Sequence, residues 1–221
     1  MKYYPVNLDI KKRKCLIIGG GSVGTRKVIR LVECGAHVTV VSPEVTGKLT
    51  SFADEGRIVL KKRSYQSSDL EGMFLVIGAS DNKELNRQIS EDARRCNIMC
   101  NIADLPEACD FILPSLVSRG DLLIAISTSG KSPAFAKKLR RNLETEYGEE
   151  YAGFLKLMGA IRKKLLSKKH APEVHRDLFE RLIDKGVLEM IKKLEVDNIN
   201  AVLFEAFGEG YEFIKLMQSD G

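Results

Sequence analysis

Six residues near the N-terminus have the types and spacing of a phosphate-binding turn. They are Gly19-Gly20-Gly21-Ser22-Val23-Gly24, a GxGxxG sequence between an apolar run and a helical pattern. In such a turn the first glycine permits the tight bend, the second lets the backbone approach a pyrophosphate, and the third lets the helix pack closely. The helix N-terminus adds free N–H groups and a partial positive charge. The pattern predicts that Gly19, Gly21 and Gly24 form a dinucleotide-binding turn; the alternative is a tight turn without a ligand.

A dinucleotide site of this kind also uses an acidic residue about 20 positions further on, which binds the ribose hydroxyls. Here the second strand-like run ends in Val40-Val41-Ser42-Pro43-Glu44, so the carboxylate follows a proline instead of standing at the strand tip. Glu44 is one candidate for this role, and the backbone at Ser42 and Pro43 is another; Glu44 could also be a solvated loop residue. No arginine follows at once to bind a 2′-phosphate, which favours NAD over NADP.

Asp104 is the candidate for proton transfer. It leaves the end of a predicted strand inside the loop Asn101–Asp110, and substrates of open α/β sheets bind beyond the carboxyl ends of the strands. When a hydride leaves carbon, a proton usually leaves a neighbouring position, and a carboxylate can accept it as a general base. The alternative is that Asp104 only caps a turn ahead of Pro106.

A second loop rich in hydroxyl groups has the sequence Ser127-Thr128-Ser129-Gly130-Lys131-Ser132-Pro133 and leads into a helical pattern. Ser127, Thr128, Ser129 and Lys131 could bind substrate carboxylates through hydroxyls, backbone N–H groups and the ammonium group. The simpler interpretation is capping of the helix by Ser132, with proline at its first position.

The histidines and cysteines do not predict a metal site. His37, His170 and His175 are scattered, and the cysteines lack the paired spacing of a zinc site. The cysteines lie in or beside apolar segments, which is typical of reduced thiols in a cytoplasmic protein. We also expect no signal peptide and no membrane span, because no apolar run is long enough. The net charge of +5 suits an acidic small molecule but is too small to indicate nucleic acid.

The elements that must position these residues alternate in the first half of the chain. Strand-like runs and helical patterns follow each other, which predicts a parallel sheet with helices on both faces. The predicted strands are 14–18, 38–41, 58–60, 74–77 and 98–102, with helices over 23–33 and from Asp81 to about Cys96.

The pattern changes near Asp110. Short strands are predicted at 111–113, 116–118 and 122–127, too closely spaced for helical crossovers, and helices follow from Ser132-Pro133 almost to the end. We therefore predict an α/β fold in three parts: a Rossmann-type parallel-sheet domain over 1–112, a small α+β segment over 113–148, and a C-terminal helical domain over 149–221.

Several ordered motifs resemble those of the precorrin-2 dehydrogenase / sirohydrochlorin ferrochelatase family, the N-terminal module of siroheme synthases. The resemblance covers residues 1–150 clearly and the helical tail only in general character. Its most specific motifs are the FILPS and SGKSP runs. The motifs are Tyr4-Pro5-Val6, the 15–24 run with Arg26-Lys27, Ala79-Ser80-Asp81-Asn82 with Asn86, Asn101-Ile102-Ala103-Asp104, the 110–115 run DFILPS, and the 127–134 run STSGKSPA.

The resemblance implies NAD-dependent oxidation of precorrin-2 to sirohydrochlorin in siroheme biosynthesis and, in some members, insertion of Fe²⁺ to give siroheme. It assigns the family's key aspartate to Asp104 and nucleotide contacts to Ser22-Val23 and Pro43-Glu44. It also implies a homodimer in which the 113–148 segment pairs two chains. The hydroxyl-rich loop departs from some relatives at Thr128, where they carry serine.

The substrate implied by the resemblance carries many carboxylates. A basic run over Lys131, Lys137, Lys138, Arg140 and Arg141 suits it, although such a run is also typical of a solvated helix face. At 221 residues we expect no room for the methyltransferase domain of fused siroheme synthases, so precorrin-2 would come from another enzyme.

Two other functions fit the same residues. One is a dehydrogenase without chelatase activity. The other is a regulatory module that binds NAD and reports it to a partner through the helical tail, which would need neither Asp104 nor affinity for tetrapyrroles.

Overall fold

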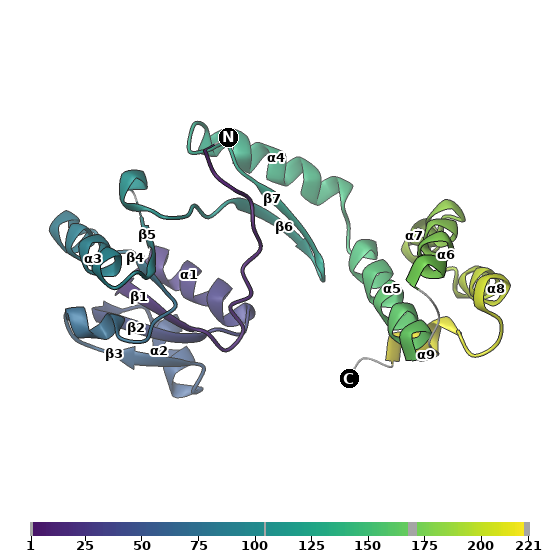
Figure 1. Ribbon diagram of the computed structural model, residues 1–221, viewed down its shortest axis with the longest axis horizontal. Coiled ribbons are helices and arrows are strands. Elements are labelled where there is room, and N and C mark those ends of the chain that lie inside the picture. The colour runs from purple at the N-terminus through teal and green to yellow at the C-terminus, as the bar shows by residue number, and fades with distance from the viewer. Residues whose placement is uncertain (1, 104, 168–171, 219–221) are drawn as a thin grey trace. The chain divides into compact units, whose positions relative to one another are not determined.

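A computed structural model describes residues 2–103, 105–167 and 172–218, with only the backbone given for 172–175. The chain forms two compact units, a first unit over residues 1–113 and a second unit over 114–221. Figure 1 shows the elements of each unit. The division of the rest of the chain at residue 148 stays a prediction.

The first unit contains a parallel five-stranded sheet with the strand order β3-β2-β1-β4-β5. This order belongs to a doubly wound Rossmann-type sheet, as the alternating pattern predicts. Its strands are β1 (Lys14–Gly20), β2 (His37–Val45), β3 (Ile58–Lys61), β4 (Leu75–Gly78) and β5 (Met99–Ile102). Its helices are α1 (Ser22–Glu33), α2 (Gly47–Asp54) and α3 (Lys83–Arg95), with the short 3-10 helices η1 (Ser67–Leu70) and η2 (Pro106–Ala108).

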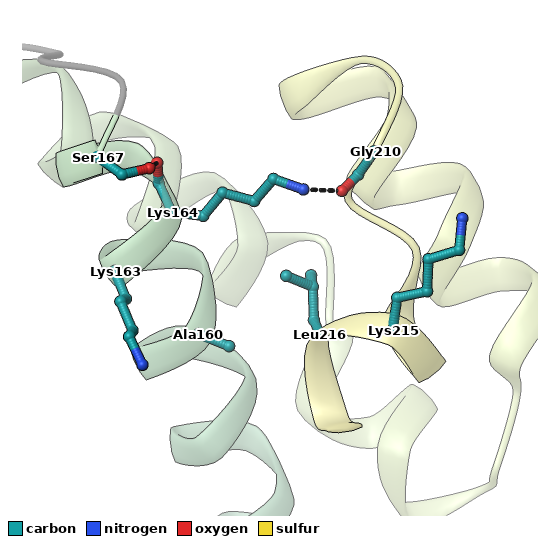
Figure 2. Close-up of a pocket in the computed structure, with 7 residues that line it drawn as sticks. All are labelled: Ala160, Lys163, Lys164, Ser167, Gly210, Lys215 and Leu216. Carbon is teal, nitrogen blue, oxygen red and sulfur yellow. Dashed lines mark hydrogen bonds between the residues drawn. The ribbon is translucent and has the colours of Figure 1, made fainter. Parts of the chain in front are cut away.

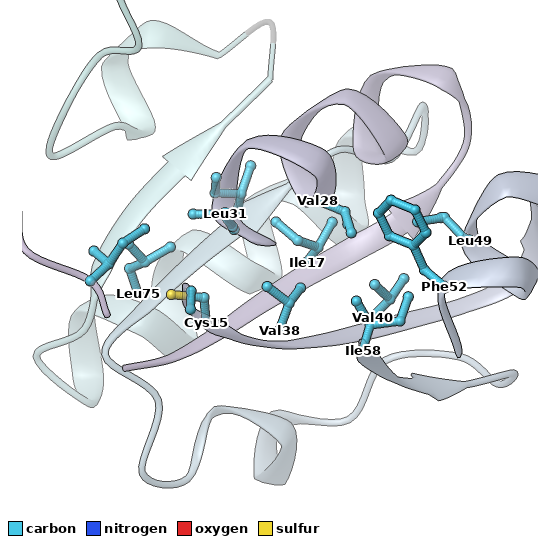
Figure 3. Close-up of a cluster of buried hydrophobic side chains, with 13 residues drawn as sticks. Cys15, Ile17, Val28, Leu31, Val38, Val40, Leu49, Phe52, Ile58 and Leu75 are labelled. Carbon is cyan, nitrogen blue, oxygen red and sulfur yellow. The ribbon is translucent and has the colours of Figure 1, made fainter. Parts of the chain in front are cut away.

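The two faces of the sheet have separate cores because successive side chains of a strand point in opposite directions. On β1, Cys15 and Ile17 pack under α1 and α2, as Figure 3 shows, whereas Leu16 and Ile18 pack on the side of α3 and η1. All four side chains are essentially inaccessible to water. The near-continuous apolar run of β1 is therefore what a strand buried on both faces requires.

Two buried carboxylates fasten the connection between β3 and β4. Asp69 accepts hydrogen bonds from Lys61 Nζ (2.9 Å) and Arg63 Nη1 (2.7 Å), and its side chain is 2% exposed. Asp92 of α3 accepts hydrogen bonds from Ser67 Oγ (2.7 Å) and from the Tyr65 hydroxyl (3.0 Å). The bond to Arg63 holds the pKa of Asp69 far below its usual range, so this carboxylate stays ionised in the fold.

The second unit begins with an antiparallel hairpin of β6 (Ser115–Arg119) and β7 (Leu122–Ile126). Helix α4 (Pro133–Glu146) packs on it and begins as predicted, with Ser132 Oγ accepting from the N–H of Phe135 at 3.2 Å. Arg119 at the end of β6 donates to the carbonyls of Glu144 and Tyr147, which fixes the C-terminal end of α4 to the hairpin.

The remaining helices share one apolar core. Its most buried side chains are Leu157, Ile161, Leu182, Val187, Ile199 and Leu203. Lys164 crosses a shallow cavity and donates to the carbonyl of Gly210, so its amine joins α5 to the turn before α9 (Figure 2). The helices are α5 (Glu150–Ser167), α6 (Pro172–Asp184), α7 (Val187–Lys192), α8 (Val196–Phe207) and α9 (Phe213–Gln218).

Two local expectations are wrong, and one helix was not predicted. Residues 111–113 do not form a strand, and the carbonyl of Phe111 accepts from the Asn101 side chain instead of from a neighbouring strand. Helix α2 was not expected, since eight residues give too little periodicity. Helix α3 begins at Lys83 and not at the predicted Asp81, because Asn82 is its cap: the Asn82 side chain accepts from the N–H groups of Glu84 and Leu85.

Candidate functional site

The residues Gly19–Gly24, called here the glycine loop, join β1 to α1. At Gly19 and Gly24, other backbone atoms lie so close that a side chain would overlap them. Gly19 has a φ of +110°, and a Cβ placed there would overlap the carbonyl of Ala79. A Cβ at Gly24 would overlap the carbonyl oxygen of Gly19. Both positions therefore require glycine, as the spacing predicts for the tight turn and for close packing of the helix.

The N-terminus of α1 is open. Gly21 is the N-cap, and among the described residues no side chain caps it and no acidic residue stands in the first turn. A Cβ added at Gly21 would have no described heavy atom within 4 Å. The free N–H groups of the first turn, at Ser22 and Val23, are thus available to an anion such as a pyrophosphate. The residues present therefore fit a dinucleotide.

Two threonines that sequence reasoning missed tie the glycine loop to the end of β2. Thr25 Oγ1 lies 2.9 Å from the carbonyl oxygen of Gly21 and 2.8 Å from Thr46 Oγ1. The N–H of Thr46 also donates to the carbonyl of Gly20 at 3.1 Å. Since Thr25 donates to Gly21, Thr46 must donate to Thr25. A threonine in the first turn of a helix is the available signal, but it is common and has no fixed partner in the sequence.

Ser42, Pro43 and Glu44 lie within β2, which is longer than the predicted strand of 38–41. Ser42 is buried and its hydroxyl donates to the carbonyl of Glu44 at 2.6 Å, so it is already engaged. Pro43 and the Glu44 side chain are exposed, and the Glu44 carbonyl lies so close to Gly20 that a Cβ there would overlap it. The β2 end thus borders the glycine loop, the position that a ribose-binding carboxylate requires.

Asp104 lies outside the described residues. The neighbouring β4–α3 connection is described and also borders the glycine loop at Ala79. Asn86 of α3 is 6% exposed and donates from Nδ2 to the carbonyl of Ser80 at 2.8 Å, which fixes this connection. Among the described residues its Oδ1 atom has no hydrogen-bond partner.

The residues Ser127–Ser132, called here the hydroxyl loop, belong to the second unit. Some of their polar groups form hydrogen bonds within the loop. The N–H of Ser129 donates to Ser127 Oγ (3.1 Å), and the N–H of Ser132 donates to Thr128 Oγ1 (3.2 Å). Ser129 and Lys131 have exposed side chains, and Ser129 has a positive φ of 52°. Two hydroxyls therefore shape the loop, while the side chains of Ser129 and Lys131 point outward.

The described ranges contain neither a candidate metal cluster nor a helix that could span a membrane. Those residues contain no group of three or more histidine, cysteine, aspartate or glutamate side chains arranged to hold a metal ion. None of the helices there combines the length and apolar character needed to cross a membrane. His37 begins β2 and is exposed, whereas His170 and the side chain of His175 are outside the described residues.

The strand order and the open glycine loop define a dinucleotide-binding protein of the Rossmann class. A family model described as NAD(P)-binding matches residues 6–115, and one described as the central part of sirohaem biosynthesis proteins matches residues 119–146. The chain belongs to the precorrin-2 dehydrogenase and siroheme synthase family.

The relatives that carry this assignment are similar over most of the chain. The siroheme synthase of Methylococcus capsulatus is 33% identical over 206 residues, which is 93% of this chain and 44% of that protein. That of Methylobacillus flagellatus is 37% identical over 192 residues, 85% of this chain and 41% of that protein. The chain thus spans less than half the length of these relatives. A solved structure, SirC, precorrin-2 dehydrogenase, has a TM-score of 0.76 at 25% identity, covering 92% of this chain and 98% of that one.

Proposed function

We propose that this protein oxidises precorrin-2 to sirohydrochlorin with NAD⁺. The observation that carries the proposal is the glycine loop, in which open first-turn N–H groups face free space beside the end of β2. The names and coverage of the siroheme synthases and of the SirC structure support the choice of substrate.

The glycine loop would hold the pyrophosphate through backbone N–H groups at Ser22 and Val23, with Gly21 leaving the space. Glu44 at the β2 end would accept hydrogen bonds from the adenosine ribose, and its negative charge disfavours a 2′-phosphate, which is why we propose NAD over NADP. NAD⁺ supplies a two-electron acceptor when bound.

Asp104 is the proposed general base. Removing two hydrogens from precorrin-2 would release a hydride, for which bound NAD⁺ would be the acceptor, and a proton, which the Asp104 carboxylate would accept. The same carboxylate could take up pyrrole N–H protons if Fe²⁺, as a second substrate, enters sirohydrochlorin to give siroheme. This assignment comes from the sequence, in which Asp104 follows the last residue of β5, Ile102, by two positions.

The second unit would supply substrate contacts and the subunit interface. Ser129 and Lys131, whose side chains are exposed, would bind tetrapyrrole carboxylates, with Ser127 and Thr128 keeping the loop in shape. The β6–β7 hairpin with α4 would pair two chains into a homodimer.

A single-turnover assay tests the proposal. Purified protein would receive precorrin-2 from coupled enzymes, with NAD⁺ and then Fe²⁺ added while absorbance is followed. We expect NAD⁺-dependent formation of sirohydrochlorin, lost at least about 100-fold in Asp104→Ala with NAD⁺ affinity unchanged. Iron insertion above the rate without enzyme would establish the chelatase. Folded protein that binds NAD⁺ but converts no precorrin-2 would refute the dehydrogenase.

A further inference from the structure

The outer edge of β5 is covered by the chain itself. β5 is the last strand of the sheet, so its outer N–H and C=O groups lack a neighbouring strand. The residues Cys109–Phe111, called here the return segment, run back along this edge. The N–H of Asp110 donates to the carbonyl of Cys100 (2.9 Å), and the N–H of Cys100 donates to Asp110 Oδ2 (2.9 Å). Asn101 Nδ2 donates to the carbonyl of Phe111 at 2.8 Å.

Cys109 stands where the return segment meets the end of β5. Its Sγ accepts from the N–H of Ile102 at 3.1 Å and lies 3.3 Å from the carbonyl oxygens of both Ile102 and Leu105. One S–H can donate to only one of these carbonyls at a time. The thiol therefore joins both ends of the connection 102–105, and that connection contains Asp104 in the sequence.

The thiol is suited to this role because it keeps its proton. Burial raises the pKa of Cys109, and the neighbouring carboxylates of Asp110 and Glu107 raise it further. The hydrogen bond from the N–H of Ile102 lowers this pKa in part, but the net shift is upward. At neutral pH the group is thus an S–H that donates and accepts. The N–H of Ala108 also donates to the carbonyl of Leu105 at 3.0 Å, and this bond connects Leu105 to η2.

We propose that Cys109 and Asp110 are positioning residues for the oxidation: they hold Ile102 and Leu105, the described residues that flank Ala103 and Asp104 in the sequence, against the edge of β5. The proposal rests on the proposed function, because Asp104 matters only if it accepts the proton. Neither residue needs to touch the substrate. A loop open at its base would leave the carboxylate in many orientations, and a loss of alignment lowers the rate of proton transfer more than substrate affinity.

Hydrogen exchange measured by mass spectrometry, together with steady-state kinetics on the full chain, tests this inference. Cys109→Ala removes every thiol contact, whereas Cys109→Ser keeps a hydroxyl that donates and accepts. Asp110→Ala breaks the second attachment, and Cys96→Ala, at an exposed cysteine on the C-terminal end of α3, is the matched control. The readouts are exchange in a peptide over 103–108, exchange in β1 and β4, kcat, and the KM for NAD⁺.

We expect Cys109→Ala to speed exchange over 103–108 and to lower kcat, each about tenfold, with β1, β4 and the KM for NAD⁺ unchanged. Asp110→Ala should act in the same direction, and Cys109→Ser and Cys96→Ala should stay within about threefold of wild type. Unchanged exchange in Cys109→Ala would overturn the inference, as would equal losses in the Ala and Ser variants. A wild-type protein with no activity would refute the proposed function instead, and the exchange data would still decide whether the loop is held.

Discussion

The glycine loop and the hydroxyl loop both precede a helix, yet they use their polar groups in different ways. In the glycine loop, close backbone contacts at Gly19 and Gly24 set the shape, and the N–H groups of the first helical turn remain open. In the hydroxyl loop, Ser127 and Thr128 accept bonds from the loop's own N–H groups, and Ser132 caps α4. A ligand-binding loop therefore cannot be recognised from the number of its polar side chains. What matters is whether the structure leaves them available.

Gly19→Ala gives the largest effect we expect. The side chain would overlap the Ala79 carbonyl in a backbone conformation with φ +110°, which should cost about 2–4 kcal/mol of unfolding free energy. Gly130→Ala in the hydroxyl loop is the matched control: its φ is +79°, but no described heavy atom lies within 4 Å of an added Cβ, so the cost should be about 1 kcal/mol. Denaturant titration of both variants compares the loops directly. Equal losses would contradict the role of close backbone contact.

Gly21→Asp should abolish most nucleotide binding without harming the fold. Gly21 has ordinary extended backbone angles and open surroundings, and aspartate is a favourable N-cap. Its carboxylate would occupy the pyrophosphate site and repel the negatively charged pyrophosphate. We expect the Kd for NAD⁺ to rise about 100-fold, or about 2.7 kcal/mol. Calorimetric titration with NAD⁺ measures this. Gly21→Ala should weaken binding less, and an unchanged Kd in the aspartate variant would show that the nucleotide binds elsewhere.

Asp69→Asn should destabilise the first unit by about 2 kcal/mol at pH 7. Because the folded-state pKa of Asp69 is depressed, its contribution is present above the unfolded pKa of about 3.9 and is lost as pH falls below that value. The difference between wild type and variant should therefore shrink steadily below about pH 4. Urea unfolding at several pH values tests this. A difference that does not change with pH would mean that the Asp69 charge contributes nothing.

Thr128→Ala and Ser129→Ala give the smallest effects and separate two roles within the hydroxyl loop. Thr128→Ala removes the acceptor for the N–H of Ser132 and should cost about 1 kcal/mol of stability. Ser129 has an exposed side chain, so Ser129→Ala should change stability by less than about 0.5 kcal/mol but raise the KM for precorrin-2 about threefold. Thermal unfolding and steady-state kinetics measure both. The reverse pattern would mean that Thr128 contacts the substrate.

The parallel sheet and the glycine turn were predictable because the patterns that indicate them are local in the sequence. β1 is apolar on consecutive positions, and GxGxxG fixes both a bend and a close contact. Helix α2 and the true extent of β2 were not predictable, since an eight-residue helix and a strand that continues through Pro43 both depend on neighbouring elements.

The polar contacts around the candidate site were harder to predict than the backbone. Thr25 and Thr46 are 21 positions apart, and only the folded sheet brings their hydroxyls within 2.8 Å. The sequence predicts that Cys109 is an ordinary thiol beside an apolar segment. Its hydrogen-bond partners are backbone carbonyls, which every residue carries, so the residue types around it do not indicate these bonds. Ser127 and Thr128 stay predicted ligands, but the sequence does not show that part of their bonding capacity is used within the loop.

The return segment has a consequence for the protein in crowded or unfolding conditions. A bare edge strand is a template on which another chain can add its own strand, the first step of aggregation. Asp110 and Cys109 occupy the hydrogen-bonding groups of Cys100 and Ile102, so this border of the sheet offers little to a passing strand. The other border, β3, is only four residues long and ends in Lys61, whose charge is a second deterrent. Both borders of the sheet are thereby protected against self-association.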